Sequence, residues 1–388
     1  MFVFLNGITN EAGLPIHVIV KKADQSLFED ILISNGIQFT ADNKIIQDAL
    51  VPRSEDTESF FGTFNTYKAI EQWVETKLNL KQSNLQKVVI GRTFEGRDIV
   101  ILKLPTRIPS ESTSSVVILG GEEGRDWISH AVILKLLDSI LENFKYLESL
   151  RNYYNIYFCP LLNPDGYEYS TFSRFWSKNR KTSPSNQSCI GVNVDRNWHL
   201  DSSKRSTFRC EGINIGERSL SEKETSSLAA YLNTIAPNLM AFINVRGFRS
   251  FITTPAYIKE HENNYPLMNE IMKTASQSFY KKFKKPYKYS ASVMYNFTGN
   301  CADWVKSQLN IPIVYTIYMT HEDELIPQPD HVFPLAEQLS VYLEESLNFA
   351  RNIYSPLFNS SFCNNICSKL ELLLVILLIK MEKYFFYL

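Results

Sequence analysis

One short stretch, residues 117–129, constrains the fold of this chain more than any other. It reads VILGGEEGRDWIS, which is an apolar strand, a glycine-rich turn and the first turn of a helix. Glu123 and Asp126 stand three residues apart where the strand passes into the helix. In α/β proteins, ligands and catalytic groups gather outside the carboxyl ends of the strands. The stretch therefore predicts a central strand of an α/β fold with a functional site at its end.

Apolar runs and helical periodicities alternate through most of the chain. Short apolar runs predict strands at residues 88–90, 99–102, 116–119, 154–159, 239–245 and 313–318. Apolar residues at helical spacing predict helices at residues 67–78, 128–141 and 335–354. Strands that alternate with helices indicate an α/β class, with a largely parallel or mixed sheet that has helices on both faces.

Composition and charge set the domain organisation and the class of partner. The chain has 388 residues, 44% hydrophobic and 21% charged, so a large core is expected and long disorder is not. The formal net charge of −1 does not favour nucleic acid as a partner. We expect a small N-terminal unit with a linker at 1–58, one α/β domain at 59–355, and a tail at 356–388. The apolar run of the tail, residues 372–379, is shorter than the roughly twenty residues that span a bilayer.

Cys189 and Cys210 flank a polar excursion rich in serine and arginine. This arrangement suits a loop closed by a disulfide in a secreted protein, although composition is also compatible with two unpaired thiols. Residues 1–5 are too short an apolar start for a signal peptide. On this basis the protein is either intracellular or begins upstream of the given sequence.

Several motifs, taken in order, resemble those of the zinc metallocarboxypeptidase family (peptidase M14, of the pancreatic carboxypeptidase A and B type), which removes single residues from peptide C-termini. Residues 163–167 read NPDGY, residues 191–198 read GVNVDRNW, and residues 125–129 read RDWIS, each similar to a family motif. Tyr295 and the pair Asp303-Trp304 match the spacing of the family's tyrosine and Asp-Trp pair. The resemblance covers most of the chain and implies an eight-stranded mixed sheet flanked by helices.

The resemblance also bears on the ends of the chain and its compartment. It implies that residues 1–58 are a partial activation segment and linker, with release near Arg53. It implies a disulfide between Cys189 and Cys210. It further implies an extracellular, monomeric protein whose partners are peptides or protein C-termini, although this chain shows no signal peptide.

The resemblance assigns a metal site to the turn within residues 117–129, where the strand passes into the helix. The family holds zinc with two histidines and one glutamate, and a separate glutamate is the general base. Here the ligand positions fall on Glu123, Asp126 and Arg246. Arginine stays protonated and has no lone pair to donate, so we expect no zinc or other cofactor. Because a buried charge must be paired, we expect Arg246 to donate to Glu123 and Asp126 instead. Mg²⁺ or Ca²⁺, with His130 as a further ligand, is the alternative, but those ions need more oxygens than the motif supplies.

The base and oxyanion positions are also replaced. The general-base position falls on Tyr318, and a tyrosine with a pKa of about 10 is a poor base near neutral pH. The position of the oxyanion-stabilising arginine falls on Ser177, with Lys178 and Arg180 close behind it.

The substrate-binding positions are better preserved. Arg196 matches the arginine that grips the terminal carboxylate, and Asp195 beside it is expected to weaken that grip by repulsion. Tyr295 matches the tyrosine that closes over substrate, and Arg125 matches a subsite arginine. Ala302 falls at the floor of the specificity pocket, where a small apolar residue does not select basic side chains.

These replacements predict a carboxypeptidase-like protein that is catalytically inactive and binds peptides or peptide C-termini. Loss of a single element of such a site already costs orders of magnitude in rate. The alternative is an active zinc carboxypeptidase with non-standard ligands. A structural or storage role is compatible with the sequence but has no positive support in it.

Overall fold

The structure is a computed structural model. It describes the following residues: 2–4, 16–41, 59–80, 84–110, 113–142, 147–183, 186–198, 214–247, 251–255, 265–285, 287–290, 299–320 and 326–358.

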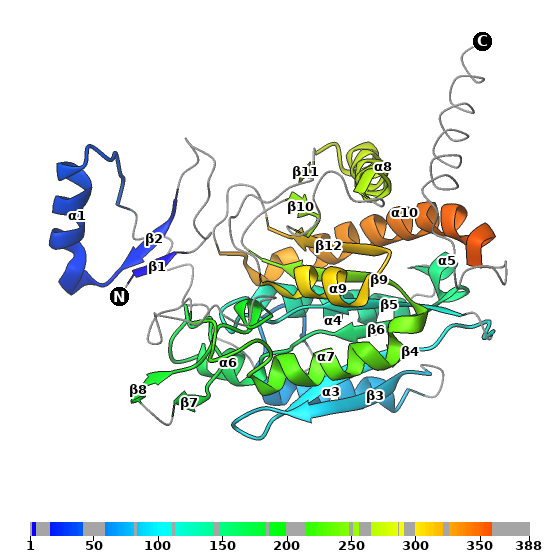
Figure 1. Cartoon of the computed structure of the whole chain (residues 1–388), viewed down its shortest axis with the longest axis horizontal. Helices are drawn as coiled ribbons and strands as arrows, with labels where there is room; N and C mark the ends of the chain where they lie inside the picture. The colour runs from blue at the N-terminus through cyan, green and yellow to red at the C-terminus, as the bar shows by residue number, and fades with distance from the viewer. Residues whose placement is uncertain are drawn as a thin grey trace, which may run out of the picture.

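An eight-stranded mixed sheet forms the centre of the molecule, in the order β11-β10-β12-β9-β5-β6-β4-β3 (Figure 1). The strands are β3 (Gln86–Arg92), β4 (Asp98–Leu104), β5 (Ser114–Leu119), β6 (Tyr154–Cys159), β9 (Leu239–Arg246), β10 (Phe251–Thr253), β11 (Lys288–Ser290) and β12 (Ile313–Tyr318). The four central strands, β12, β9, β5 and β6, run parallel. Their carboxyl ends therefore meet at one edge. The predicted mixed sheet is confirmed.

Helices cover both faces of the sheet, because the side chains of its strands alternate between two apolar layers. Val116 and Ile118 of β5 face one layer, whereas Val117 and Leu119 face the other. The first layer is closed by α3 (Tyr67–Leu78), α4 (Trp127–Glu142), α8 (Tyr265–Phe283) and α10 (Val332–Phe358). The second is closed by α7 (Lys223–Ile235) and α9 (Cys301–Leu309).

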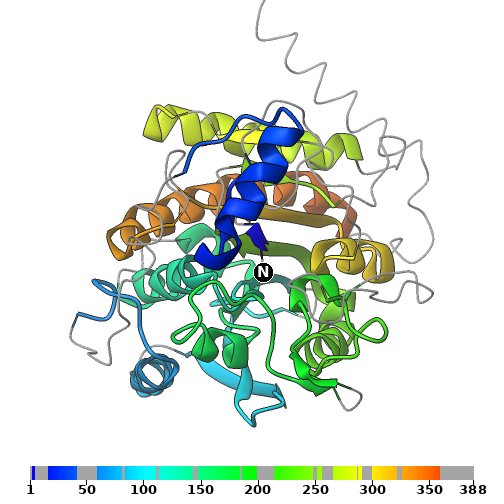
Figure 2. The ribbon, with the colours of Figure 1, turned by 90° about the vertical axis from the view of Figure 1, so that its left-hand side faces the viewer.

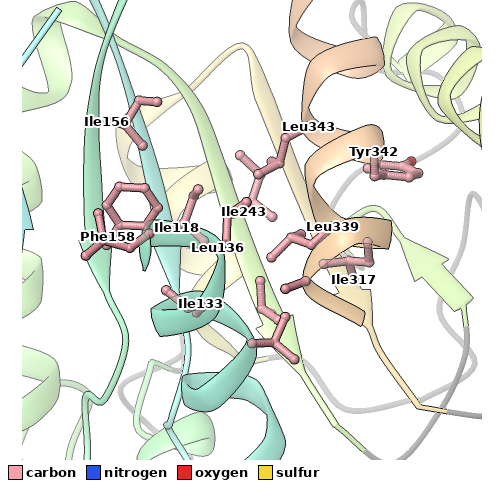
Figure 3. Packing of buried hydrophobic residues seen from close by; sticks show 14 of the residues in the cluster. Ile118, Ile133, Leu136, Ile156, Phe158, Ile243, Ile317, Leu339, Tyr342 and Leu343 are labelled. Atoms are coloured by element: carbon pink, nitrogen blue, oxygen red, sulfur yellow. The ribbon is translucent and has the colours of Figure 1, made fainter. Parts of the chain in front are cut away.

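The larger of the two layers is a continuous apolar core. Figure 3 shows Ile118 and Ile243 of the sheet packed against Leu136 of α4 and Leu339 of α10. Each of these side chains is at most 1% exposed. Full burial of one such side chain contributes about 1.5–3 kcal/mol, so this layer holds the central strands and their ends in place.

The turn after β5 approaches the turn after β6 closely. The N–H of Gly120 donates to the carbonyl of Cys159 at 2.9 Å, and the N–H of Asn163 donates to the carbonyl of Gly121 at 2.9 Å. Gly121 has φ +63°, and a Cβ there would lie 2.7 Å from Leu161 Cδ1 and 2.9 Å from the Pro160 carbonyl oxygen. Only glycine fits both the conformation and the space. The two turns thereby set the position of residues 122–126.

The smaller elements lie outside the sheet. β1 (Phe2–Phe4) pairs with β2 (Val18–Val20), followed by η1 (Lys22–Asp24) and α1 (Gln25–Ser34), which has no buried residue. Further short elements are α5 (Glu148–Arg151), α6 (Pro164–Tyr169), β7 (Thr182–Ser183), β8 (Asn186–Ile190), η2 (Val194–Arg196), η3 (Ala236–Asn238) and η4 (Pro329–His331). None of the helices in the described ranges is both long and apolar enough to cross a bilayer. The apolar run at 372–379 lies outside those ranges.

Candidate functional site

The candidate site lies at the carboxyl edge of the four parallel strands. Residues 120–126 follow β5, α6 follows β6, Arg246 ends β9 and Tyr318 ends β12. The 3₁₀ helix η2 brings Asp195 and Arg196 to the same edge. In Figure 2 this edge faces the viewer, with α1 crossing in front of it. The structure therefore brings together most of the residues that the sequence assigns to the site.

The side chain of Arg246 is the centre of a buried charge cluster. Its Nη1 lies 2.5 Å from Asp195 Oδ1 and 3.4 Å from Glu122 Oε2, and its Nη2 lies 3.4 Å from Glu123 Oε1. Burial acts to lower the pKa of Arg246, but Asp195, Glu123 and Glu122 outweigh it and raise that pKa well above its usual value. The guanidinium is therefore permanently charged and held by the carboxylates of Asp195 and Glu123 and by the carboxyl group of Glu122.

Glu123, at the first family ligand position, is clamped between two arginines. Its Oε2 accepts from Arg125 Nε at 2.8 Å, while its Oε1 faces Arg246. Burial acts to raise the pKa of Glu123, but Arg125 and Arg246 lower it to about 2. The expected pairing of Arg246 with Glu123 is present, and the lone pairs of this carboxylate are engaged by guanidinium groups.

Asp126, at the second ligand position, does not form the predicted ion pair with Arg246. Its Oδ2 accepts the N–H of Gly247 at 2.9 Å, and its Oδ1 accepts the N–H of Ser129 at 3.2 Å. The second contact places Asp126 as the cap of α4. Burial raises the pKa of Asp126 despite these hydrogen bonds. The prediction was wrong because backbone donors from α4 and from the end of β9 already occupy both oxygens.

Glu122 is a member of the cluster that sequence reasoning missed. Its Oε2 accepts from Asn244 Nδ2 at 2.6 Å and faces Arg246. Burial and the neighbouring charge of Asp195 raise the pKa of Glu122 to about 8, so its carboxyl is mostly protonated at neutral pH. One signal was available. Asn244 is a polar residue in an apolar strand, two positions before Arg246 and therefore on the same face of β9.

Asp195 and Arg196 lie side by side at the cluster. Arg196 Nε is 3.5 Å from Asp195 Oδ2, and the Arg196 side chain is 26% exposed. Asp195 was expected to repel a bound carboxylate. Its ion pair with Arg246 offsets much of that repulsion, because the two atoms are 2.5 Å apart and largely shielded from water. Arg196 is thus more exposed than Arg246, and Asp195 beside it already has Arg246 as its ion-pair partner.

Tyr318, at the general-base position, is opposite Arg246 in the register of β12 and β9. Its ring stacks on Phe251 of β10, with centroids 4.5 Å apart and planes inclined by 11°. Its carbonyl accepts from the hydroxyl of Tyr287 at 2.5 Å. The side chain is packed as a half-buried aromatic residue next to the cluster.

Ser177, at the position assigned to the oxyanion arginine, and the two cations that follow it contact neighbouring loops and aromatic rings. The carbonyl of Ser177 accepts the N–H of Gly124 at 3.2 Å. Lys178 Nζ lies 5.0 Å from the Trp176 ring, and the Arg180 guanidinium lies 3.6 Å from the Tyr169 ring. Burial, followed by the charge of Arg180, lowers the pKa of Lys178 to about 8. Both cations thus pack on aromatic rings.

Arg174, which sequence reasoning did not single out, contacts the backbone of Arg125 beside the cluster. Its Nη1 donates to the carbonyl of Arg125 at 2.7 Å, and its guanidinium lies 3.8 Å from the Trp127 ring. Because Arg125 in turn pairs with Glu123, Arg174 helps to hold Arg125 in place at the site.

The NPDGY motif stabilises the loops around the site. Asn163 accepts the N–H of Gly166 at 2.9 Å, capping α6, and donates to the carbonyl of Glu122 at 3.0 Å. Asp165 accepts from Thr93 Oγ1 at 2.7 Å and from Arg97 Nη1 at 2.8 Å. The motif therefore ties the turn after β5 to the hairpin between β3 and β4.

Of four other predicted residues, Tyr295, Cys189, Cys210 and Ala302, the structure describes only Cys189 and Ala302. Tyr295 lies outside the described residues. Cys189 is disulfide-bonded, but its predicted partner Cys210 also lies outside them, so the pairing stays a prediction. Ala302 is 1% exposed on α9, within the second apolar layer.

The donor set does not fit a zinc ion. Of the three ligand positions, Glu123 is paired with two arginines, Asp126 with two backbone donors, and Arg246 carries a positive charge itself. Within the described part of the chain, no group of three or more His, Cys, Asp or Glu side chains is arranged to hold a metal ion. His130, the further ligand considered, packs its ring edge-to-face on Tyr167 with centroids 4.5 Å apart.

Comparison with known proteins agrees with this architecture. The zinc carboxypeptidase family model matches residues 70–349. The chain is 27% identical over 299 residues to zinc carboxypeptidase A 1 of Anopheles gambiae, covering 73% of this chain and 68% of that protein. It is 26% identical over 302 residues to carboxypeptidase B of Rattus norvegicus, covering 74% and 72%.

The fold is similar to that of thrombin-activatable fibrinolysis inhibitor. The TM-score is 0.80 at 20% identity, over 91% of this chain and 93% of that one. The family match spans well over half of the present chain, and the ordered motifs lie at the carboxyl edge of the sheet. The chain belongs to the zinc carboxypeptidase family.

Proposed function

We propose that this protein is a non-catalytic member of its family that binds peptides through their C-terminal carboxylate. The observation that carries the proposal is the position of Arg246, whose guanidinium stands at a metal-ligand position and is held by Asp195, Glu122 and Glu123. A cation cannot share this space with a permanently charged guanidinium without strong repulsion.

The chemistry of the family requires a water that is activated by a metal and a base. Glu123 and Asp126 have their oxygens engaged by arginines or backbone N–H groups. Tyr318 offers a phenol, which gives up its proton only at high pH. The replaced metal-ligand positions and the replaced base support the loss of hydrolysis, because neither a metal nor a base is then available to activate the water.

The binding side of the site has kept its arginines. Arg196 is partly exposed beside Asp195, and Arg125 and Arg246 contribute further positive charge. Because burial and Asp195 favour the protonated form of Glu122, Arg125, Arg196 and Arg246 are matched mainly by the carboxylates of Glu123 and Asp195. A carboxylate ligand would bind Arg196 through paired N–H groups, the geometry that arginine favours.

A comparison of free and blocked peptides tests this binding mode. A peptide with a free C-terminal carboxylate should bind about tenfold more tightly than its amide, which corresponds to about 1.4 kcal/mol. Arg196→Met should remove that preference, whereas Arg92→Met, an exposed arginine on β3, should keep it. Equal affinity of acid and amide for the unaltered protein would reject the carboxylate site.

A hydrolysis assay on the same peptides separates binding from turnover. We expect no release of C-terminal residues, with or without added zinc. Release that is abolished by a chelator would show an active zinc carboxypeptidase with non-standard ligands and would reject the non-catalytic assignment.

Other features that the family resemblance implies are also proposed for this chain. We propose that residues 1–58 are a partial activation segment, that Cys189 pairs with Cys210, and that the protein is an extracellular monomer. The disulfide at Cys189 and the position of α1 in front of the carboxyl edge in Figure 2 support these assignments. Limited proteolysis tests the first, and a single cut near Arg53 is the expected product.

A further inference from the structure

Two buried carboxyl groups lie side by side at the start of α7. Glu222 and Glu224 are each 1% exposed. Both accept from the same donor, Asn179 Nδ2, which lies 2.8 Å from Glu222 Oε2 and 3.1 Å from Glu224 Oε2. Two carboxylates that share one site repel each other, so one of them favours its protonated form.

Glu224 is the carboxyl group of this pair that keeps the proton. Lys181 Nζ lies 3.2 Å from Glu222 Oε1, and the hydroxyl of Ser221 donates to the same oxygen at 2.7 Å. In contrast, Glu224 Oε1 is buried and has no hydrogen-bond partner among the described residues. Burial, with the charges of Glu222 and Asp165, raises the pKa of Glu224 to about 7, although its own N–H and the Asn179 amide act to lower it.

The other charges around Glu224 do not neutralise it. Asp165 of α6 adds negative charge and is itself paired with Arg97 Nη1 at 2.8 Å. Lys178 and Arg180, in the loop that approaches α7, pack on aromatic rings. The amino end of α7 favours an anion, but both carboxyl groups of the turn share that effect, and it is smaller than the cost of burying an unpaired charge.

Asn179 connects the carboxyl pair to the segment that leads into the candidate site. Its Oδ1 accepts the N–H of Val192 at 2.8 Å, and its N–H donates to the carbonyl of Val192 at 2.9 Å. A Cβ at Gly191 would overlap the carbonyl oxygen of Asn179, so the two backbones are in close contact. Val192 stands two residues before η2, which carries Asp195 and Arg196.

The other end of η2 is also held by the first turn of α7. Asn197, which directly follows Arg196, accepts the N–H of Glu222 at 3.1 Å and the hydroxyl of Thr225 at 2.7 Å through its Oδ1. The start of α7 therefore holds the chain on both sides of Arg196.

We propose that Glu224 is a proton-operated latch for the carboxylate-binding side of the candidate site. With its proton in place, the shared amide of Asn179 holds residues 178–181 and 191–192 against α7. Loss of the proton puts a second negative charge beside Glu222 in a buried position, which favours opening of this contact. The effect of the latch on peptide binding rests on the proposed function, whereas the latch itself does not.

The direction of the pH dependence follows from the raised pKa of Glu224. The closed latch keeps a proton up to about pH 7, whereas an opened, hydrated carboxyl group releases it near its usual value of 4.5. The closed state is therefore favoured in acid, and its stability is lost as the pH rises from about 4.5 to about 7.

Hydrogen–deuterium exchange without any ligand tests the latch. After correction for the intrinsic exchange rate, opening of residues 176–183 and 190–198 should rise about tenfold or more from pH 5 to pH 7. Glu224→Gln, which mimics the protonated form, should show a rise of about threefold or less. Glu75→Gln, at a side chain that is 54% exposed, should behave as the unaltered protein does.

Two outcomes of this experiment would overturn the proposal. One is an equal rise in Glu224→Gln and in the unaltered protein, since another group would then be responsible. The other is no rise in the unaltered protein. If Glu224→Gln does not fold, Glu222→Gln replaces it, because it removes the neighbouring charge. The rise should then be at least about threefold smaller, and an unchanged rise would reject the latch.

Peptide binding at pH 7.5 tests whether the latch reaches Arg196. Glu224→Gln should bind a peptide with a free C-terminal carboxylate about threefold or more tightly than the unaltered protein does. Equal affinities, together with the expected difference in exchange, would overturn the link from the latch to Arg196. No binding by either protein would reject the proposed function instead, and the exchange experiment would still decide whether the latch exists.

Discussion

Arg246 Nη1 and Asp195 Oδ1 lie 2.5 Å apart, and this contact joins the end of β9 to the 3₁₀ helix η2 across the candidate site. The pair is largely shielded from water, with side chains 11% and 6% exposed. By the resemblance to the family, Arg246 is assigned to a metal-ligand position and Asp195 to a carboxylate-binding position. The ion pair thereby joins the two groups of residues that the resemblance assigns to the site.

Removal of Arg246 should destabilise the fold strongly. Arg246→Met would leave the buried negative charges of Glu123 and Asp195 less well neutralised, because both carboxylates lie within 3.4 Å of the guanidinium. Breaking a buried ion pair from one side costs about 3–5 kcal/mol of unfolding free energy. Urea denaturation measures the change. Arg92→Met, at an exposed pair with Asp98, should cost about 1 kcal/mol or less, and equal effects of the two substitutions would contradict the cluster.

Stability should fall in acid because of Glu123. Arg125 and Arg246 overcome the effect of burial and lower the folded-state pKa of Glu123 from 4.5 to about 2. The stabilisation is present above the unfolded pKa and is lost as the pH falls from about 4.5 to about 2, an effect of about 3 kcal/mol. Glu123→Gln should flatten the stability curve in that window. A variant with an unchanged acid slope would show that Glu123 is not clamped by the arginines.

Glu122 should have the opposite pH dependence. Burial and Asp195 raise its folded-state pKa from 4.5 to about 8, so the folded protein retains a proton that the unfolded chain releases. Stability is therefore lost as the pH rises from about 4.5 to about 8. Glu122→Gln should abolish this loss. Glu75→Gln, at a side chain that is 54% exposed, serves as the control and should leave the slope unchanged.

The turn before the site should not tolerate a side chain at Gly121. Its φ of +63° is unfavourable for other residues, and an added Cβ would lie 2.8 Å from Leu161 Cα. Gly121→Ala should lower the unfolding free energy by about 1–3 kcal/mol or more. Gly96→Ala has a similar positive φ of +86° but nothing within 4 Å, so it isolates the conformational part of the cost. Equal losses would show that the close approach at Gly121 contributes nothing.

Much of the architecture could be predicted because it depends on local patterns. The apolar run at 116–119 and the helical spacing from Ile128 onward correspond to β5 and α4. The pairing of Arg246 with Glu123 followed from the rule that buried charges need partners. In contrast, Asp126 is taken by the backbone of Gly247, a contact that depends on where β9 ends relative to α4. Glu122 was missed because its burial and its bond to Asn244 are properties of the assembled sheet.

A designed reversal tests whether the ligand positions are assigned correctly. Glu123→His, Asp126→Glu, Arg246→His and Tyr318→Glu together should create a zinc site with about one ion per chain. The matched control carries the other three substitutions but keeps Arg246, and it should bind no zinc because the guanidinium remains. Zinc bound equally by both variants would show that Arg246 does not occupy the metal position.

The zinc content of the unaltered protein, measured after incubation with zinc and removal of free metal, tests the central claim most directly. The charge cluster around Arg246 predicts far less than one zinc per chain. About one zinc per chain, removed by a chelator together with release of C-terminal residues from peptides, would contradict it.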